Sequence, residues 1–256
     1  MLFRRKKIIG DRHNLDVYSK PTTVEYYDQL IGLQPVEKYI FDKYILHNFS
    51  ILDLGVGGGR TTPFLSANTK NYIGVDYSSS MINVCIKKYP SLQFLTLDAS
   101  DLSTFKAENF EVAVFSFNGV DYLLESKRLS CLNEVNRVLK PDGLFIFSTH
   151  NARMIFLPPR LNCVSLLKKL WRVLRSVKYL SLSVRQLCRR SFYQGWGTIV
   201  DPVHGSLLTH VSTPKYVSRE LQEMGFELIE IVSSNYPDNS GVLTTPWFYY
   251  VARKVQ

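Results

Sequence analysis

Ile51-Leu52-Asp53-Leu54-Gly55-Val56-Gly57-Gly58-Gly59-Arg60-Thr61-Thr62 is the stretch that decides the fold. A short, mostly apolar run leads into a run of glycines, and a helix-compatible pattern follows. This order is typical of a buried strand, a tight turn and the first turn of a helix. Because glycine has no Cβ, a ligand can lie directly on such a turn. The free N–H groups at the start of the helix then face that ligand.

The type of ligand follows from two side chains in the same stretch. A dinucleotide site requires G-x-G-x-x-G, with an acidic residue about 20 positions further on. Gly55 and Gly57 fit this pattern, but Arg60 occupies the place of the third glycine. Asp53 would repel phosphates and suits an ammonium group better. The stretch therefore favours a ligand with a cationic end over a dinucleotide.

Five segments, in this order and spacing, resemble the motifs of the class I S-adenosylmethionine-dependent methyltransferases. They are residues 51–62, 72–78, 97–99, 115–122 and 138–144. Each segment alone is weakly specific, and their order makes the resemblance specific. It covers about residues 45–150, with weaker continuity to the C-terminus. The resemblance implies S-adenosylmethionine as the cofactor.

Alternating strand and helix patterns predict an α/β fold with a doubly wound sheet. After the first strand, the expected strands are residues 71–75, 92–97, 111–117, 144–148, 226–232 and 247–252. Pro141-Asp142-Gly143 is expected to turn into the fifth of them. The family resemblance adds a seven-stranded order of 3-2-1-4-5-7-6, with strand seven antiparallel. We expect a single methyltransferase domain over residues 1–256.

The candidate cofactor residues fall at the carboxyl ends of strands one to four, where open α/β sheets bind ligands. By the resemblance, these residues would hold the methionine part (Asp53, Gly55, Gly57, Gly58, Arg60), the ribose (Asp76) and the adenine (Tyr77, Met81, Asp98, Ala99) of the cofactor. Phe117 and Asn118 follow strand four and would also contact the cofactor.

Several of these residues have an alternative interpretation. The two carboxylate oxygens of Asp76 can accept hydrogen bonds from both ribose hydroxyls. Asp76 and Asp98 can instead cap the helices after their strands. Arg60 either reaches the cofactor carboxylate or is a solvated helix residue. A tyrosine-bearing N-terminal helix often covers this pocket in related enzymes, which implicates Tyr18, Tyr26 or Tyr27; these tyrosines can equally pack against the core.

Three residues are candidates for chemistry on the methyl acceptor. Asp121, after strand four, either orients or deprotonates a hydroxyl or caps the following helix. His150, after strand five, is a candidate general base because histidine titrates near neutral pH, although a lone histidine is commonly structural. His204 is a second candidate base. His204 and His210 lack a carboxylate at matching spacing, so no metal site is predicted.

The net charge of +9 is concentrated in one segment. Residues 151–200 hold ten Lys or Arg and no acidic residue, which leaves −1 for the rest of the chain. Residues 151–212 are too long for an ordinary loop, so we expect a helical insertion after strand five that covers the substrate. Around 163–190 the pattern predicts a basic amphipathic helix. It would cap the site, bind an anionic or lipid-linked acceptor, lie on an acidic membrane surface, or be a solvated lid.

The resemblance implies an S-adenosylmethionine-dependent methyltransferase. The expected location is the cytoplasm, with the inner membrane surface as an alternative. No stretch approaches the roughly 20 apolar residues of a membrane span, and the four cysteines have no C-x-x-C spacing. The expected acceptor is a small molecule, sugar or lipid-linked glycan, methylated on oxygen. The alternatives are an RNA methyltransferase and a non-catalytic cofactor-binding protein. No nucleic-acid substrate is expected, because strand four does not end in the N/D-P-P-[YF] tetrad of the enzymes that methylate amino groups of nucleic acids.

Overall fold

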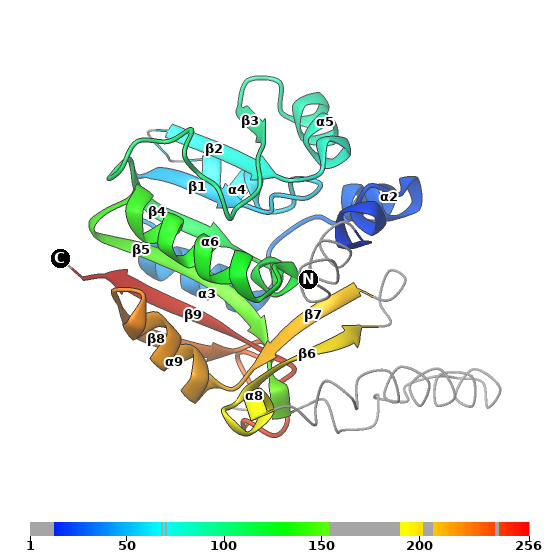
Figure 1. Ribbon diagram of the computed structural model, residues 1–256. Helices are drawn as coiled ribbons and strands as arrows, with labels where there is room; N and C mark the ends of the chain where they lie inside the picture. The colour runs from blue at the N-terminus through cyan, green and yellow to red at the C-terminus, as the bar shows by residue number, and fades with distance from the viewer. Residues whose placement is uncertain are drawn as a thin grey trace.

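The computed structural model describes residues 13–67, 69, 71–153, 190–201, 207–238 and 241–255. Its centre is a seven-stranded sheet of order β3-β2-β1-β4-β5-β9-β8 (Figure 1). The strands are β1 (Ser50–Leu54), β2 (Asn71–Asp76), β3 (Gln93–Thr96), β4 (Phe110–Phe115), β5 (Leu139–His150), β8 (Phe226–Ser233) and β9 (Trp247–Lys254). Strands β1 to β5 are parallel, and β9 runs antiparallel to both β5 and β8. The expected order is confirmed, with β9 and β8 as the seventh and sixth strands.

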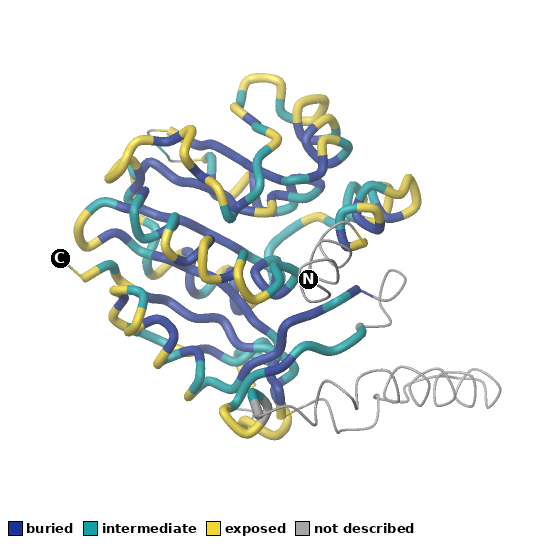
Figure 2. The backbone as a smooth tube through the Cα atoms, in the orientation of Figure 1, coloured by how far each residue is buried: buried dark blue, intermediate teal, exposed yellow. Residues whose placement is uncertain are grey.

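Helices cover both faces of this sheet. They are α2 (Pro21–Gln29), α3 (Pro35–Tyr44), α4 (Thr62–Ser66), α5 (Ser79–Lys88), α6 (Glu125–Val138), α8 (Arg190–Tyr193) and α9 (Pro214–Glu223), with the 3₁₀ helix η1 (Gly119–Tyr122). Side chains of α6 and α9 join the apolar core on one face, and those of α3, α4 and α5 join the core on the other. The central strands are buried along their length between these layers (Figure 2), as a parallel sheet requires.

Local sequence explains where several helices begin. Pro35 opens α3 behind a capping box, in which Gln34 and Glu37 satisfy each other's backbone N–H groups. Thr213 caps α9 by accepting the N–H of Tyr216, and Pro214 follows it. Proline is tolerated in a first turn because its missing N–H has no helical partner there.

Pro141-Asp142-Gly143 differs from the expected turn. These residues lie inside β5, where the pairing with β4 shifts between Phe110 and Val112. Asp142 takes a left-handed φ of 61°. Between the pairs Phe110–Leu139 and Val112–Leu144, one residue of β4 therefore faces four residues of β5, and the chain turns within the strand before its pairing resumes.

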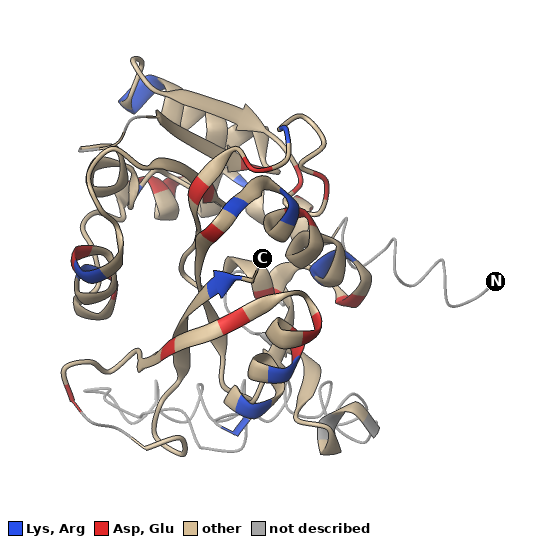
Figure 3. Ribbon diagram, turned by 90° about the vertical axis from the view of Figure 1, so that its left-hand side faces the viewer, with Lys and Arg blue, Asp and Glu red and all other residues tan. Residues whose placement is uncertain are grey.

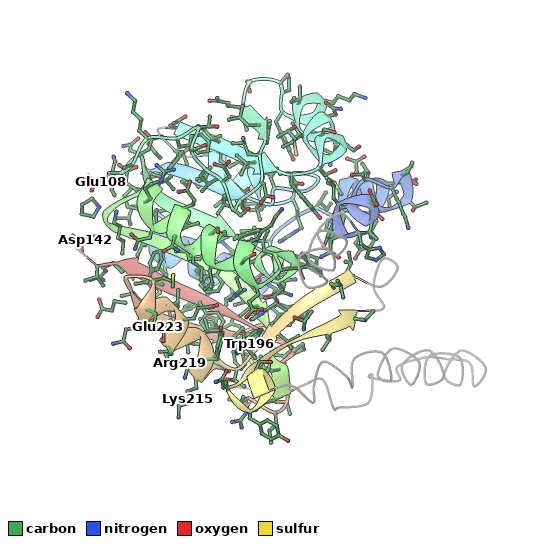
Figure 4. All side chains as sticks on the ribbon, viewed as in Figure 1. Glu108, Asp142, Trp196, Lys215, Arg219 and Glu223 are labelled. Atoms are coloured by element: carbon green, nitrogen blue, oxygen red, sulfur yellow. The ribbon has the colours of Figure 1, made fainter. Side chains whose placement is uncertain are left out.

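The described part of the insertion is mainly a β-hairpin, which was not expected, and most of the expected helical insertion lies outside the described residues. Strands β6 (Trp196–Asp201) and β7 (Leu207–Ser212) pair antiparallel, and Ser212 bridges to Asn151 beyond the end of β5. Trp196 stands close to α9 (Figure 4), where its ring packs on His210 and Tyr216. The predicted basic helix around 163–190 lies outside the described residues, apart from Arg190 at the start of α8. In the described residues, the positions of Lys and Arg are interspersed with those of Asp and Glu along the ribbon (Figure 3).

Helix α2 packs directly on the backbone of the glycine turn. A Cβ on Gly58 would collide with the carbonyl oxygen of Tyr27, at the end of α2. The Lys88 ammonium of α5 fastens the contact, since it lies 2.6 Å from a carboxylate oxygen of Asp28 and donates to the carbonyl of Gly58 at 3.1 Å. Gly58 is thus required by this helix contact, in addition to any contact with a ligand.

A buried ion pair joins α6 to α9. Arg128 is 1% exposed, and its Nε and Nη2 donate to the Glu220 carboxylate at 3.0 and 2.8 Å. Its Nη1 lies 3.4 Å from Oδ1 of Asp121, which is fully buried. These contacts fix both helices against η1.

Replacing Arg128 by methionine should destabilise the fold by about 3–5 kcal/mol, because Glu220 and Asp121 would keep buried charges without their cation. Urea denaturation of the two proteins measures this difference. Lys38→Met is the control, since the Lys38–Asp42 pair is exposed and its loss should have a far smaller effect. Equal effects would contradict the structural role given to Arg128.

Gly58→Ala should displace α2 and lower the melting temperature, because the new methyl group has no space beside Tyr27. Gly241→Ala is the matched control, since a Cβ there meets nothing within 4 Å. Differential scanning fluorimetry and limited proteolysis of the N-terminal helices report the two effects. Identical melting temperatures for the two variants would show that α2 does not pack as described.

Candidate functional site

Two adjoining cavities lie at the carboxyl ends of β1, β2 and β4. The larger has an empty volume of about 690 Å³ and the smaller about 370 Å³, in the usual size range of small-molecule sites. Both are lined by Tyr27, Gly55, Gly57, Ser116 and Phe117. One elongated ligand can therefore occupy both, with one end in each.

Gly55 supplies the close approach between turn and sheet. Its φ is +61°, a conformation that favours glycine. A Cβ there would lie 2.6 Å from the ring of Phe115 on β4. The turn can follow β1 this tightly only without a side chain at that position.

Asp53 faces the smaller cavity from the end region of β1. It is 1% exposed, and its Oδ2 accepts hydrogen bonds from the hydroxyls of Thr61 and Tyr72, each at 2.9 Å. Burial raises the pKa of Asp53 to about 6, against the lowering effect of the two hydroxyls. A cationic group in this cavity would favour the ionised carboxylate, as the sequence analysis expected of a cofactor ammonium.

Asp76 ends β2 in the wall of the larger cavity. Its Oδ2 accepts the N–H of Gly57 at 3.0 Å, and its Oδ1 accepts the N–H of Ser78 at 2.8 Å. Burial raises its pKa to about 6, although both backbone bonds lower it. Ser78 precedes α5, so this contact holds the loop before the helix, and α5 has no side-chain cap. Each carboxylate oxygen keeps a further lone pair, so ribose binding and this loop contact are compatible.

The predicted adenine-binding residues line the larger cavity together: Tyr77, Met81, Asp98 and Ala99. The Asp98 carboxylate lies 2.6 Å from the Lys127 ammonium and accepts two bonds from Ser100. Partial burial raises the pKa of Asp98, but the contacts with Lys127 and Ser100 lower it further, so the pKa lies below its ordinary value. Asp98 is therefore an ionised acceptor at the cavity edge.

Arg60 lines the smaller cavity, but its guanidinium is already paired. Nη1 and Nη2 each lie 2.6 Å from an oxygen of Glu37, and Nη1 also donates to the carbonyl of Gly32. Its side chain is 12% exposed, so it is not a solvated helix residue. Arg60 holds the start of α3 and the preceding linker against the glycine turn. A contact with a cofactor carboxylate stays a prediction.

The backbone after β4 is held in an unusual conformation. Phe117 and Asn118 both take left-handed φ angles, 56° and 60°, and such residues often cluster at functional sites. The N–H of Asn118 donates to the hydroxyl of Ser148 at 2.8 Å, which stabilises this bend. Phe117 lines both cavities, whereas Asn118 lines neither.

Ser116 is a wall residue that sequence analysis did not assign. It lines both cavities, and its buried hydroxyl has no hydrogen-bond partner among the described residues. The hydroxyl of Tyr77, in the wall of the larger cavity, is also buried and also has no hydrogen-bond partner among the described residues. Buried polar groups are normally paired, so these hydroxyls indicate a polar ligand. The position of Ser116 directly after a buried strand was the available signal.

Tyrosines cover the larger cavity. Tyr18, from the helical residues 13–18, lies within 5.3–6.0 Å of the rings of Tyr27, Tyr77 and Tyr122. All four line the larger cavity. The resemblance implied that Tyr18, Tyr26 or Tyr27 covers the methionine end, and of these only Tyr27 also lines the smaller cavity, which contains Asp53. Tyr26 is 45% exposed and packs edge-on against Tyr27 instead.

A single buried amide, Asn14, attaches this cover to the hairpin. Its Nδ2 donates to the carbonyls of Tyr122 and Leu208, and its Oδ1 accepts the N–H of Leu208. Helix 13–18, η1 and β7 are therefore joined at one side chain.

Asp121 and His150 form a pair beside this site. Oδ2 of Asp121 accepts the backbone N–H of His150 at 2.7 Å and lies 2.8 Å from its Nδ1. Thr149 donates to Oδ1 at 2.6 Å. Asp121 is fully buried, so direct deprotonation of an acceptor by Asp121 does not fit this arrangement. It orients His150 instead.

His204 lies outside the described residues. His210 is 4% exposed, and its Nε2 has no hydrogen-bond partner among the described residues. Burial, with help from nearby Arg128 and His150, holds the pKa of His210 well below its ordinary value. Within the described ranges, no group of three or more His, Cys, Asp or Glu is placed to hold a metal ion.

None of the described helices is long and apolar enough to cross a membrane. The proposed membrane contact through the basic helix falls on residues that the structure does not describe, so it stays a prediction.

Comparisons with known proteins agree with this geometry. A family model described as "Methyltransferase domain" matches residues 51–143. The uncharacterized protein MJ1252 of Methanocaldococcus jannaschii is 31% identical over 137 residues, which cover 50% of this chain and 51% of that protein. The ubiquinone/menaquinone biosynthesis C-methyltransferase of Campylobacter jejuni is 26% identical over 114 residues, 42% of this chain and 47% of that enzyme. The chain spans about half the length of these curated relatives.

A crystal structure of an S-adenosylmethionine-dependent methyltransferase from Methanosarcina mazei has the same fold. It superposes with a TM-score of 0.61 at 20% identity and covers 88% of this chain and 99% of that one. The matched domain contains the glycine turn, Asp76 and Asp98 in the cavity walls. The family model thus identifies residues 51–143 as a methyltransferase domain, and the sheet order is that of the S-adenosylmethionine-dependent methyltransferase from Methanosarcina mazei.

Proposed function

We propose that this protein transfers the methyl group of S-adenosylmethionine to a small-molecule acceptor. The observation that carries the proposal is the pair of adjoining cavities, with Asp53 in the smaller and Asp76 and Asp98 in the larger. A cofactor with an ammonium group at one end and a nucleoside at the other matches this distribution of carboxylates. The unpartnered hydroxyls of Ser116 and Tyr77 supply further polar contacts.

The bound cofactor would supply a methyl group on a cationic sulfur, ready for displacement. The residues of this chain would bind and orient the two reactants. Asp76 would accept hydrogen bonds from the ribose hydroxyls, and the negative charge of Asp53 would balance the positive charge of the ammonium. The tyrosine cover, Tyr18, Tyr27 and Tyr122, would exclude water and hold the acceptor in line, which is the main contribution of a protein to such a reaction.

The acceptor would enter beside η1 and the end of β5, where Asp121 and His150 lie. We propose a hydroxyl-bearing sugar, glycolipid or other small molecule as the acceptor. The similarity to a quinone C-methyltransferase makes an aromatic ring carbon the second candidate. Calorimetry with S-adenosylmethionine, followed by a screen of small molecules with the methyl-labelled cofactor, tests the proposal. Binding without transfer to any acceptor would favour a non-catalytic cofactor-binding protein.

Asp76→Ala should weaken the binding of S-adenosylhomocysteine at least about tenfold, because each lost charge-assisted hydrogen bond contributes about 1.5–3 kcal/mol. Isothermal titration calorimetry measures the change, and circular dichroism checks the fold. Asp101→Ala is the control, because Asp101 is exposed and its carboxylate accepts a hydrogen bond from Ser103, outside the cavity walls. An unchanged dissociation constant would limit Asp76 to holding the glycine turn and Ser78.

Asp53 should make the ligand-free protein less stable as the pH rises from about 4 to about 6. Its pKa is raised from 3.8 to about 6 in the fold. Over this interval the unfolded chain therefore releases the proton before the folded chain does, and the folded state loses stability. The free energy of unfolding of the wild type relative to Asp53→Asn should fall over this interval. Adding S-adenosylmethionine should oppose the fall, since its ammonium favours the carboxylate.

A further inference from the structure

Behind the cofactor cavity, a chain of buried charged side chains leads to His150. It begins at Glu220 on α9, passes through Arg128 on α6 and continues to Asp121 on η1. Glu220, Arg128 and Asp121 are 4%, 1% and 0% exposed. His150 is the last member, with its side chain 24% exposed, so the chain opens to solvent only at the imidazole.

The charges in this chain do not balance without His150. Two carboxylates face one guanidinium, which leaves one negative charge in a buried environment. Burial opposes the charge on Arg128, but Glu220 and Asp121 keep its pKa above the ordinary value, so the guanidinium stays charged. A proton on His150 would complete the balance, because its Nδ1 lies 2.8 Å from Asp121. The arrangement therefore stabilises His150 after it has accepted a proton.

Among the residues that the structure describes, the other titratable groups near these four side chains do not supply the missing positive charge. His210 on β7 lies near Arg128 and His150, but burial lowers its pKa far below the ordinary value, so it is neutral. Burial raises the pKa of Tyr216 on α9 to about 12. Burial also raises the pKa of Tyr250 on β9, with Asp121 contributing. Both phenols are therefore neutral at physiological pH.

The contacts of His150 also select its tautomer. The carboxylate of Asp121 can only accept, so the neighbouring Nδ1 carries hydrogen. In the neutral ring, Nε2 is then the acceptor, and the Asn118 amide nitrogen lies 3.4 Å from it. Nε2 is thus the nitrogen that can take a proton from another molecule.

His150 stands beside the cofactor cavity and does not line it. Its ring is 6.5 Å from that of Tyr122, which does line the cavity, and 6.4 Å from that of Trp247. Asn118 follows Phe117, another wall residue. An acceptor held between Tyr122 and His150 would be close to both the cofactor and the imidazole.

We propose that His150 is the general base of the methyl transfer and that Asp121, held by Arg128 and Glu220, is its positioning residue. This inference rests on the proposed function and narrows the acceptor to molecules that react through a hydroxyl group. The acceptor oxygen forms a bond to the methyl carbon as the sulfur–methyl bond breaks, and that electron pair stays on sulfur. The hydroxyl proton passes to Nε2 of His150 and is later released to water.

A hydroxyl acceptor fits this base better than an amine. A hydroxyl is a weak nucleophile until a base removes its proton. A neutral amine attacks with a lone pair that it already has, and it does not need a base at the moment of attack. A buried charge chain that ends in an oriented imidazole is therefore useful mainly to a hydroxyl.

The first test requires no acceptor. ¹⁵N NMR of the ligand-free protein, with the ring signals of His150 identified by their loss in His150→Gln, should show hydrogen on Nδ1 and a bare Nε2 in the neutral ring. In Asp121→Asn, this tautomer should lose its dominance. A neutral His150 with hydrogen on Nε2 in the wild type would overturn the proposal, whether or not the protein binds S-adenosylmethionine.

The second test measures transfer from S-adenosylmethionine to matched panels of phenols, aliphatic alcohols, thiols and amines. His150→Gln should lower kcat for hydroxyl acceptors about 100-fold or more, with the dissociation constant of S-adenosylhomocysteine unchanged. His47→Gln, an exposed histidine between α3 and β1, is the matched control and should keep full activity. Turnover of hydroxyl acceptors that survives in His150→Gln, or turnover confined to amines or thiols, would contradict the proposal.

The positioning role is tested with Glu220→Gln, which should lower kcat less than His150→Gln does and leave KM for the acceptor nearly unchanged. Thr149→Ser, which keeps the hydroxyl that donates to Asp121, should retain activity. Thermal unfolding identifies any variant that fails to fold. If Asp121→Asn does not fold, the wild-type tautomer and the His150→Gln kinetics still decide the outcome.

Discussion

The carboxylate of Asp76 is the contact on which the cofactor site depends. One oxygen accepts the N–H of Gly57 and the other accepts the N–H of Ser78. The glycine turn after β1 and the loop before α5 are thereby fixed by one side chain at the end of β2. Because this carboxylate is buried, both bonds are shielded from water, and the two connections that form the cavity wall keep their relative position.

Much of this wall was predictable from the sequence, because it is encoded locally. A run of glycines after an apolar strand has few alternatives, and the carboxyl ends of parallel strands share one edge of the sheet. Asp53, Asp76, Asp98 and Tyr77 could be placed by that reasoning. The role of Arg60 could not be decided, because its partner Glu37 lies on α3, 23 positions earlier in the chain, and no local pattern identifies a distant ion pair.

Other features depend on tertiary contacts that a sequence pattern does not contain. Gly58 resembles a ligand-binding glycine, but the backbone of α2 also requires it. Asp121 resembles a residue that is free to act on an acceptor, yet it is buried behind His150. The hairpin of β6 and β7 was missed because the length and charge of residues 151–212 suggested helices. The β-branched residues in both strands, Thr198 to Val200 in β6 and Thr209 and Val211 in β7, were the overlooked signal.

The tyrosine cover has a consequence for the order in which the site is completed. Asn14 bonds to Leu208, a partner 194 positions away along the chain, so the cover closes one of the longest loops in the protein. Closing such a loop costs chain entropy that only the finished fold offsets. During synthesis, the sheet from β1 to β5 can assemble before residue 208 has left the ribosome. The cofactor cavity therefore gains its complete cover only after most of the chain has been made.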